Sequence, residues 1–290
     1  MEEPEPFDLL TDAIDVAREA DTAVVLVGLD GEWETEGVDR ETMSLPAAQI
    51  ELIRNVIAAN ANTVVVINAG SPVDTSPFRY EACAILQLWY PGQSFGLALA
   101  DVLTGVAEPG GRLPMTIPER FEDHPAFLNY PGEHGHVRYG EGIFVGYRGF
   151  QNREVMPAFP FGHGLGYARF ELDEAVAELD GECVRLCFRL RNVSERAGAT
   201  VVQSYFGGPA DGIARPVREL CDFVRVSLEA GENCDIERRI PLARFAYFDP
   251  REEEFRNEAG RMRIDVGFSS ADLRMQLDVE LAEGRFDAPA

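Results

Sequence analysis

The order of apolar and polar positions divides the chain into two parts of different character. In the first part, apolar runs with the length of buried strands alternate with segments of helical spacing. The strand-like runs are 22–29, 63–68 and 84–89. The helical segments are 11–20, 46–60 with Ser44 as its cap, and 95–103. Strands joined by crossovers long enough for a helix pair in parallel, so we expect a parallel sheet covered by helices on both faces.

The later part of the chain has the period of short, half-buried strands. Apolar and polar residues alternate along 183–190, 200–206, 219–228, 261–268 and 273–281. Turn residues separate these strands, and their density is typical of an immunoglobulin-like or fibronectin type III-like sandwich. The predicted fold class is therefore a partial, mostly parallel α/β sandwich followed by an all-β sandwich.

A segment rich in proline, glycine and aromatic residues, 110–168, separates the two patterns. A loop of this length without its own periodicity usually covers a neighbour or lines a site. We assign it to the first domain, so the predicted domains are 1–168, an α/β domain, and 169–290, a β-sandwich.

The charge of the chain is strongly negative. It carries 50 Asp and Glu against 26 basic residues, all of them arginine, for a formal charge of −24. Nucleic-acid binding needs a basic surface, so this balance excludes DNA and RNA as partners. The same charge disfavours anionic membranes, and no segment approaches the roughly 18 apolar residues of a membrane span. Adaptation to high salt and simple solubility both fit the acidity.

The start of the chain and its cysteines indicate a reducing compartment. Residues 1–6 are acidic where a secretory signal would be basic. The five cysteines are odd in number and lack a CxxC spacing, so we expect free, buried thiols and a cytoplasmic protein. His134 and His136 have no further ligand nearby in sequence, and Gly28-Leu-Asp-Gly31 lacks the third glycine of a dinucleotide loop. No metal and no cofactor are therefore expected.

One segment carries candidate chemistry. Asp30–Arg40 holds a run of carboxylates around Trp33, just after the first strand, at the sheet edge where ligands of open α/β sheets bind. Glycoside hydrolysis needs two carboxyl groups, one of them protonated, and crowding raises the pKa of one carboxyl group. The indole of Trp33 suits stacking against a sugar ring. The alternative interpretation is a solvated acidic loop with Asp39 and Arg40 as a local ion pair.

Trp33–Arg40, followed by Leu45-Pro46 and Gln49, resembles the acid/base loop region of glycoside hydrolase family 3, the β-glucosidase and β-xylosidase family. Further segments that resemble this family follow in order at 64–72, 89–93, 100–105, 109–118, 139–148 and 159–165. The last third resembles the family's fibronectin type III-like domain at 192–193, 202–205, 216–220 and 266–270. The resemblance extends from about Asp8 to Leu281.

The resemblance implies retaining hydrolysis of β-linked glucosides or related glycosides, without a cofactor. In this family an Asp nucleophile lies on an N-terminal (β/α)8 barrel, and the acid/base Glu comes from the α/β domain. The position that matches the acid/base is Glu36, directly before Gly-x-Asp-Arg, with Glu34 and then Glu32 as alternates. Trp33 would border the subsite for the leaving group.

Two parts of the family's pattern have no counterpart in this sequence. A barrel takes about 250 residues, and the two predicted domains already occupy the 290 present, so no nucleophile is expected here. The first strand and helix of the family's α/β domain are also missing. We therefore expect an open sheet edge and an apolar face that need a partner.

Two hypotheses of function follow. In the first, the chain is the C-terminal part of a β-glucosidase-like enzyme. It acts on a β-glycoside only with a barrel from a separate chain or from a region missing from this reading frame. An acid without its nucleophile cannot form the glycosyl-enzyme intermediate, so the chain alone should be inactive. In the second, it is a non-catalytic remnant or accessory module that binds a sugar, a partner protein or a second copy of itself.

Overall fold

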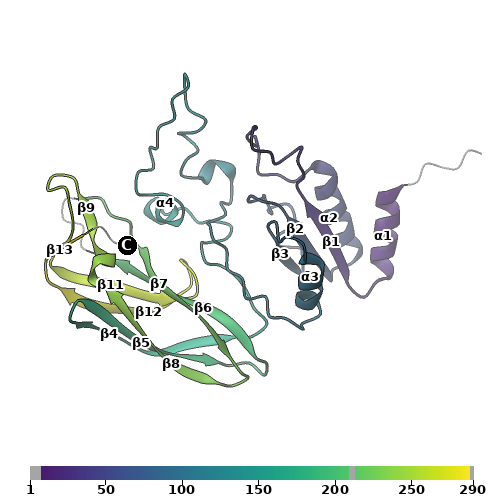
Figure 1. Cartoon of the computed structure of the whole chain (residues 1–290). Helices are drawn as coiled ribbons and strands as arrows, with labels where there is room; N and C mark the ends of the chain where they lie inside the picture. Colours follow the sequence, from purple (N-terminus) through teal and green to yellow (C-terminus); the bar gives the residue numbers. More distant parts are fainter. Residues whose placement is uncertain (1–7, 209–212, 288–290) are drawn as a thin grey trace, which may run out of the picture. The chain divides into compact units, whose positions relative to one another are not determined.

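The structure is a computed structural model that describes residues 8–208 and 213–287 (Figure 1). The described chain divides into two compact units. The first contains the residues up to Leu97 together with Glu119–Phe121, and the second contains Ala98–Pro118 and the chain from Glu122 onward. The domain boundary predicted at residue 168 rests on sequence patterns that this division does not test, and it stays a prediction.

The first unit is built on a three-stranded sheet in the order β1-β2-β3. Its strands are β1 (Ala23–Gly28), β2 (Thr63–Asn68) and β3 (Ala84–Gln87). Val25 pairs with Val65, and Val65 pairs with Ile85, so the predicted parallel pairing is confirmed. β3 ends before the predicted Trp89 because Trp89 has a left-handed backbone, with φ of 57°, which turns the chain out of the strand.

Two helices, α1 (Leu9–Glu19) and α2 (Ala47–Ala59), pack on one face of this sheet (Figure 1). α1 begins after Asp8, whose carboxylate accepts hydrogen bonds from the backbone N–H groups of Leu10 and Thr11 at 3.2 and 3.3 Å. This is the usual way in which an acidic cap satisfies the free donors of a first turn.

The start of α2 differs from the prediction. Its N-cap is Pro46 and not Ser44, because the backbone is still extended at Pro46, with ψ of 137°, and no side chain caps the first turn. The carbonyl of Pro46 accepts the first hydrogen bonds of the helix. The third helix, α3 (Phe95–Leu103), has the predicted bounds.

The core of the first unit lies between the helices and the sheet. Ile53 of α2 is fully buried against Val65 and Ile67 of β2. The opposite face of β1 is open, since Val24 and Leu26 are 50% and 52% exposed. The prediction that this strand is covered on both faces is therefore wrong. β1 is an edge strand that pairs only with β2 among the described residues, and α1 and α2 lie on one side of it.

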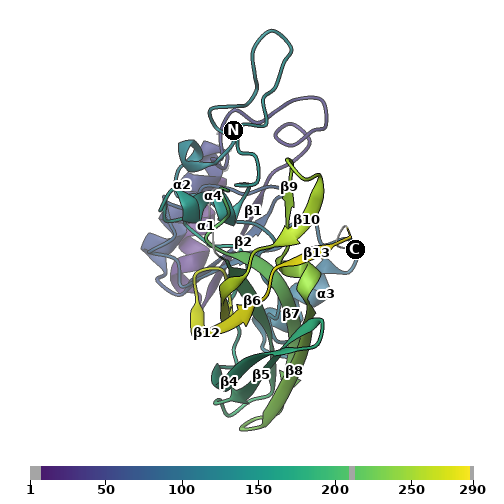
Figure 2. The ribbon, with the colours of Figure 1, turned by 90° about the vertical axis from the view of Figure 1, so that its left-hand side faces the viewer.

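The second unit starts irregularly and continues as a β-sandwich. Its irregular part contains the short helix α4 (Tyr147–Asn152) and a bridge between Ile117 and Phe159. The sandwich has two antiparallel sheets, in the orders β12-β11-β6-β7 and β4-β5-β8, and Figure 2 shows the second of these together at the lower end of the view. The strands are β4 (Phe170–Asp180), β5 (Cys183–Asn192), β6 (Gly198–Gly207), β7 (Glu219–Leu228), β8 (Asn233–Pro241), β11 (Gly260–Gly267) and β12 (Leu273–Leu281).

Smaller elements complete the chain. A third sheet has the order β13-β10-β9. Its strands and the remaining single turns are β9 (Tyr247–Asp249), β10 (Glu254–Asn257), β13 (Gly284–Phe286), η1 (Phe121–Asp123) and η2 (Leu242–Phe245). Within 8–208 and 213–287, no helix has the length and apolar character needed to cross a bilayer.

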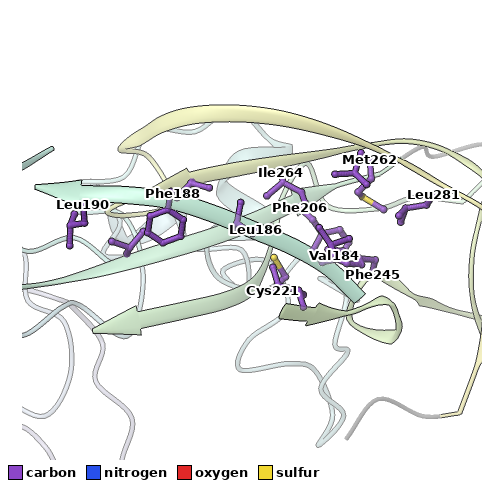
Figure 3. Close-up of a cluster of buried hydrophobic side chains, with 14 of the residues drawn as sticks. Val184, Leu186, Phe188, Leu190, Phe206, Cys221, Phe245, Met262, Ile264 and Leu281 are labelled. Carbon is purple, nitrogen blue, oxygen red and sulfur yellow. The ribbon is translucent and has the colours of Figure 1, made fainter. Parts of the chain in front are cut away.

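The core of the sandwich lies between the inner faces of its two sheets (Figure 3). Val184, Leu186 and Leu190 of β5 point inward at alternate positions and are fully buried. They belong to one cluster with Phe206 of β6 and Ile264 of β11. This is the predicted β-sandwich, with period-two alternation as its signal.

The cysteines follow the prediction in part. All five are free. Cys221 is buried in the sandwich, and its burial raises the pKa of the thiol to about 12. Cys83 is exposed, so the expectation that the thiols are all buried is wrong.

Candidate active-site loop

The acidic loop Asp30–Arg40 lies at the carboxyl edge of the parallel sheet, directly after β1. The chain that follows β2 supplies Gly70 and Ser71 to the same edge, and the chain that follows β3 supplies Tyr90. Parallel strands all end at one edge of a sheet, so segments far apart in sequence meet there. This edge is where the fold concentrates the polar residues of the first unit.

Gln49 fixes the point at which the loop leaves β1. Its Oε1 accepts a hydrogen bond from the N–H of Gly28 at 3.0 Å, and its Nε2 donates to the carbonyl oxygen of Gly28 at 2.9 Å. A Cβ on residue 28 would lie 2.1 Å from the carbonyl oxygen of Asn68, so only glycine fits this close approach. The end of β1 is thus held by β2 on one side and by α2 on the other.

Glu34 is the most firmly held side chain of the loop. Its Oε2 accepts hydrogen bonds from the backbone N–H of Gly70, at 2.7 Å, and from the hydroxyl of Tyr90. Its Oε1 accepts from the hydroxyl of Ser71 and lies 3.6 Å from Nη1 of Arg40. The side chain is only 12% exposed. One carboxylate therefore joins the segments that follow all three strands.

These contacts determine the charge state of Glu34. Partial burial acts against the charged form, but the hydrogen bonds from Ser71, Tyr90 and Gly70 and the charge of Arg40 outweigh it and lower the pKa of Glu34 below its ordinary value. The same contact raises the pKa of Tyr90, whose hydroxyl donates to a charged acceptor. Glu34 is therefore an anion at neutral pH.

Arg40 fixes the C-terminal end of the loop to the chain that follows β2. Its Nη1 donates to the hydroxyl oxygen of Ser71 and to the carbonyl oxygen of Pro72, the latter at 3.2 Å. Burial lowers the pKa of Arg40, and the charge of Glu34 opposes that shift. Both Glu34 and Arg40 are therefore fastened to the chain that follows β2.

Glu36 lies at the tip of the loop. Thr35 and Val38 form an isolated antiparallel bridge, so Glu36 and Gly37 are the two residues of the tight turn between them. The side chain of Glu36 is exposed and makes no hydrogen bond or ion pair with any described residue. A ligand can thus reach its carboxyl group without displacing a partner.

Glu32 and Trp33 occupy the first part of the loop. Glu32 is exposed, and its backbone N–H donates to the carboxylate of Asp30 at 3.0 Å. Trp33 is 37% exposed and lines a pocket of about 290 Å³ together with Glu32, Thr35 and residues 38–42. The loop therefore offers a partly open indole face beside carboxyl groups.

The structure distinguishes the three glutamates, which the residue pattern leaves equivalent and only the family resemblance ranks. Glu34 is committed to four partners and charged, whereas Glu32 and Glu36 are exposed. Sequence reasoning missed Gly70, Ser71 and Tyr90 as the groups that hold Glu34. The available signal was their position directly after β2 and β3, in segments already noted for their resemblance.

The histidine pair in the connecting segment has a structural role. Glu133 and His136 form an isolated antiparallel bridge, and His134 and Gly135 turn the chain between them. No group of three or more potential metal ligands occurs among the described residues.

The chain thus combines an α/β domain, with an acidic loop at the carboxyl edge of its sheet, and a β-sandwich. Two family models match it: the glycosyl hydrolase family 3 C-terminal domain over residues 8–167 and the fibronectin type III-like domain over 200–270. The chain therefore belongs to glycoside hydrolase family 3.

The chain is similar to β-glucosidases that are much longer. It is 42% identical to a β-glucosidase of Rhizobium radiobacter over 94% of this chain and 34% of that protein. It is 41% identical to an exo-α-(1→6)-L-arabinopyranosidase of Bifidobacterium longum over 96% of this chain and 37% of that protein. The chain spans about a third of the length of these relatives.

Solved structures give the same result. The crystal structure of a family 3 β-glucosidase from Bifidobacterium adolescentis matches with a TM-score of 0.92 and 39% identity, over 97% of this chain and 42% of that one. The β-glucosidase of Kluyveromyces marxianus in complex with glucose matches with the same TM-score, over 99% of this chain and 34% of that one. The predicted fold class, an α/β domain followed by a β-sandwich, is confirmed.

Proposed function

We propose that this chain supplies the general acid/base, Glu36, to a retaining β-glucosidase-type hydrolase whose nucleophile is on a barrel outside these 290 residues. The observation that carries the proposal is the exposed carboxyl group of Glu36 at the tip of a fastened loop, on the ligand-binding edge of the sheet. Membership of the family and the β-glucosidase relatives support the reaction class.

In the proposed reaction, the nucleophile's carboxylate attacks the anomeric carbon while Glu36 gives its proton to the glycosidic oxygen, and the bond between that oxygen and the sugar breaks. The aglycone leaves as an alcohol and Glu36 becomes a carboxylate. Glu36 then takes a proton from water as the water oxygen attacks the anomeric carbon, which frees the sugar and restores both groups. Trp33 would border the subsite of the leaving group.

Glu36 fits this role better than either alternate. Glu34 is charged and its oxygens already accept three hydrogen bonds, so it has no proton to donate. Glu32 is exposed, but it precedes the turn, whereas Glu36 is the residue directly before the Gly-x-Asp-Arg segment by which the loop resembles its family.

The exposed face of β1 in the first unit supports the proposal of a partner. Parallel sheets are normally covered on both faces, and exposed edge strands tend to pair. Val24 and Leu26 leave an apolar strip uncovered on β1, one of the two edge strands of the sheet. A barrel-bearing polypeptide that added a strand and a helix there would bury this strip.

Reconstitution tests the proposal. The purified chain, mixed with a barrel fragment of a family 3 relative, should release p-nitrophenol from p-nitrophenyl β-glucoside, whereas neither part should do so alone. Glu36→Gln should lower this rate by about 10²- to 10⁴-fold, and much less for a 2,4-dinitrophenyl glucoside, whose leaving group needs little protonation. Glu51→Gln, an exposed glutamate of α2, is the control and should have no effect.

Two results would count against this proposal. A selective loss in Glu32→Gln would transfer the acid/base role to Glu32. Absence of activity in every mixture, together with calorimetric binding of gluco-oligosaccharides, would favour a sugar-binding module, for which the partly exposed Trp33 and its pocket are the supporting observation.

A further inference from the structure

The loop between Glu34 and Arg40 is fastened at both ends. Glu34 and Arg40 both reach Ser71, which accepts from Arg40 and donates to Glu34. Between them, the bridge of Thr35 and Val38 closes a tight turn. The direction in which the turn projects is therefore set by the contacts at its base.

We propose that Glu34 is a positioning residue, a carboxylate anchor that fixes the turn carrying Glu36 relative to the sheet edge. This inference rests on the proposed role of Glu36. Glu34 itself would not touch the substrate's reacting atoms, because its side chain is 12% exposed and faces Gly70, Ser71 and Tyr90.

The chemistry of the anchor requires a carboxylate. Gly70, Ser71 and Tyr90 each direct a donor at the two oxygens of Glu34, and Arg40 adds a positive charge. An ionised carboxyl group is an acceptor only, with about four lone-pair positions, so it matches a shell made entirely of donors. A glutamine would turn an NH₂ group toward one of these donors and would lose the ion pair.

The space around the anchor is also specific. A Cβ on residue 70 would lie 2.4 Å from the ring of Tyr90 and 3.2 Å from Oε2 of Glu34. The backbone of Gly70 can therefore approach the carboxylate only because this residue has no side chain. Such a close-fitting site for one carboxylate is expected where a loop must keep one position.

The first test uses the chain alone. The amide of Gly70 donates directly to Glu34, so its hydrogen exchange, resolved by NMR, reports the anchor. Glu34→Gln should accelerate exchange at Gly70 and across 30–42 by about tenfold or more, while Glu36→Gln and Glu51→Gln should leave it unchanged. Unchanged exchange in Glu34→Gln would overturn the anchor whether or not the chain takes part in catalysis.

The second test uses the reconstituted enzyme. A displacement of about 1 Å at a catalytic group can cost roughly a hundredfold in rate, so Glu34→Gln should lower kcat about 10- to 100-fold with little change in KM. Because it acts through Glu36, it should add little to the loss in a Glu36→Gln background. A full additional loss in the double variant would overturn the positioning role and assign Glu34 its own catalytic step.

A milder variant gives a second test in case Glu34→Gln does not fold. Tyr90 is 57% exposed, so Tyr90→Phe removes one donor and leaves the ring in place. It should cause a smaller change in the same direction, in both the exchange at Gly70 and kcat. If no mixture shows activity while the exchange results hold, the anchor stands and the proposed acid/base function fails.

Discussion

The parallel sheet of the first unit and the sandwich of the second bury their apolar residues in different ways. In the sandwich, inward residues of β5 such as Leu186 are fully enclosed by a facing sheet. In the parallel sheet, the helices cover one face, and Val24 and Leu26 on the other are half exposed. The second unit therefore encloses its own core, whereas the first leaves one apolar face of β1 uncovered.

The largest effect should come from the closed core. Leu186→Ala should lower the free energy of unfolding by about 2–5 kcal/mol, because it leaves a cavity between two packed sheets. Leu26→Ala removes the same atoms from a half-exposed site and should cost about 1 kcal/mol or less. Urea denaturation followed by circular dichroism measures both. Similar costs for the two variants would contradict the contrast drawn between the sheets.

The exposed face of β1 should affect association with a barrel fragment. Leu26→Asp should change the stability of the isolated chain little, since the new carboxylate remains in solvent. It should weaken reconstitution with a barrel fragment by tenfold or more, because docking would bury an unpaired charge. Titration of p-nitrophenol release against fragment concentration gives the apparent Kd, with Glu51→Gln as the control. An unchanged apparent Kd would place the partner elsewhere.

The third prediction concerns the strand end below the loop. Gly28→Ala should destabilise the first unit by about 1–3 kcal/mol, because its Cβ would press on the backbone of Asn68. Gly31→Ala, whose Cβ would meet nothing within 4 Å, is the matched control. Both tryptophans, Trp33 and Trp89, lie in this unit, so their fluorescence during denaturation reports it. Equal stability of the two variants would contradict the tight approach.

The smallest expected effect is a dependence on pH. The pKa of Glu34 is lowered in the folded state, so its contribution to stability is present above the ordinary value of 4.5 and is lost as pH falls through the folded pKa. The difference in unfolding free energy between the wild type and Glu34→Gln should therefore shrink on acidification. A difference that is constant from neutral to acidic pH would show that Glu34 carries no such charge.

The fold could be predicted where burial leaves a regular signal. The apolar run at 63–68 has the bounds of β2, and the alternation at 273–281 has those of β12. Among the strands absent from the prediction, β4 and β8 belong to the sandwich, and β9, β10 and β13 form the small third sheet. In β4 a bulge between Asp173 and Val176 breaks the alternation, and β8 is mostly polar, with only Ile240 fully buried. Tertiary pairing with β5 determines these two strands more than their own pattern does.

The sequence locates the candidate site but does not show how the contacts of its glutamates differ. An acidic loop after a buried strand marks the ligand edge of a parallel sheet, and this much was predictable. The alternation of Glu32, Glu34 and Glu36 with other residues does not rank them, and only the family resemblance favours Glu36. What separates them is a pair of donors, Ser71 and Tyr90, that follow other strands and reach Glu34 only in the folded chain.

The side chain of Gln49 has a consequence for how the sheet can grow. Ala23 and Leu29 donate their N–H groups toward the chain of β2, so the intervening residues Val24, Leu26 and Gly28 direct theirs to the free side. At Gly28 both backbone groups are already bound by Gln49. An incoming strand can therefore extend the ladder alongside Val24 and Leu26 but must stop short of Gly28, so it leaves the acidic loop Asp30–Arg40 uncovered.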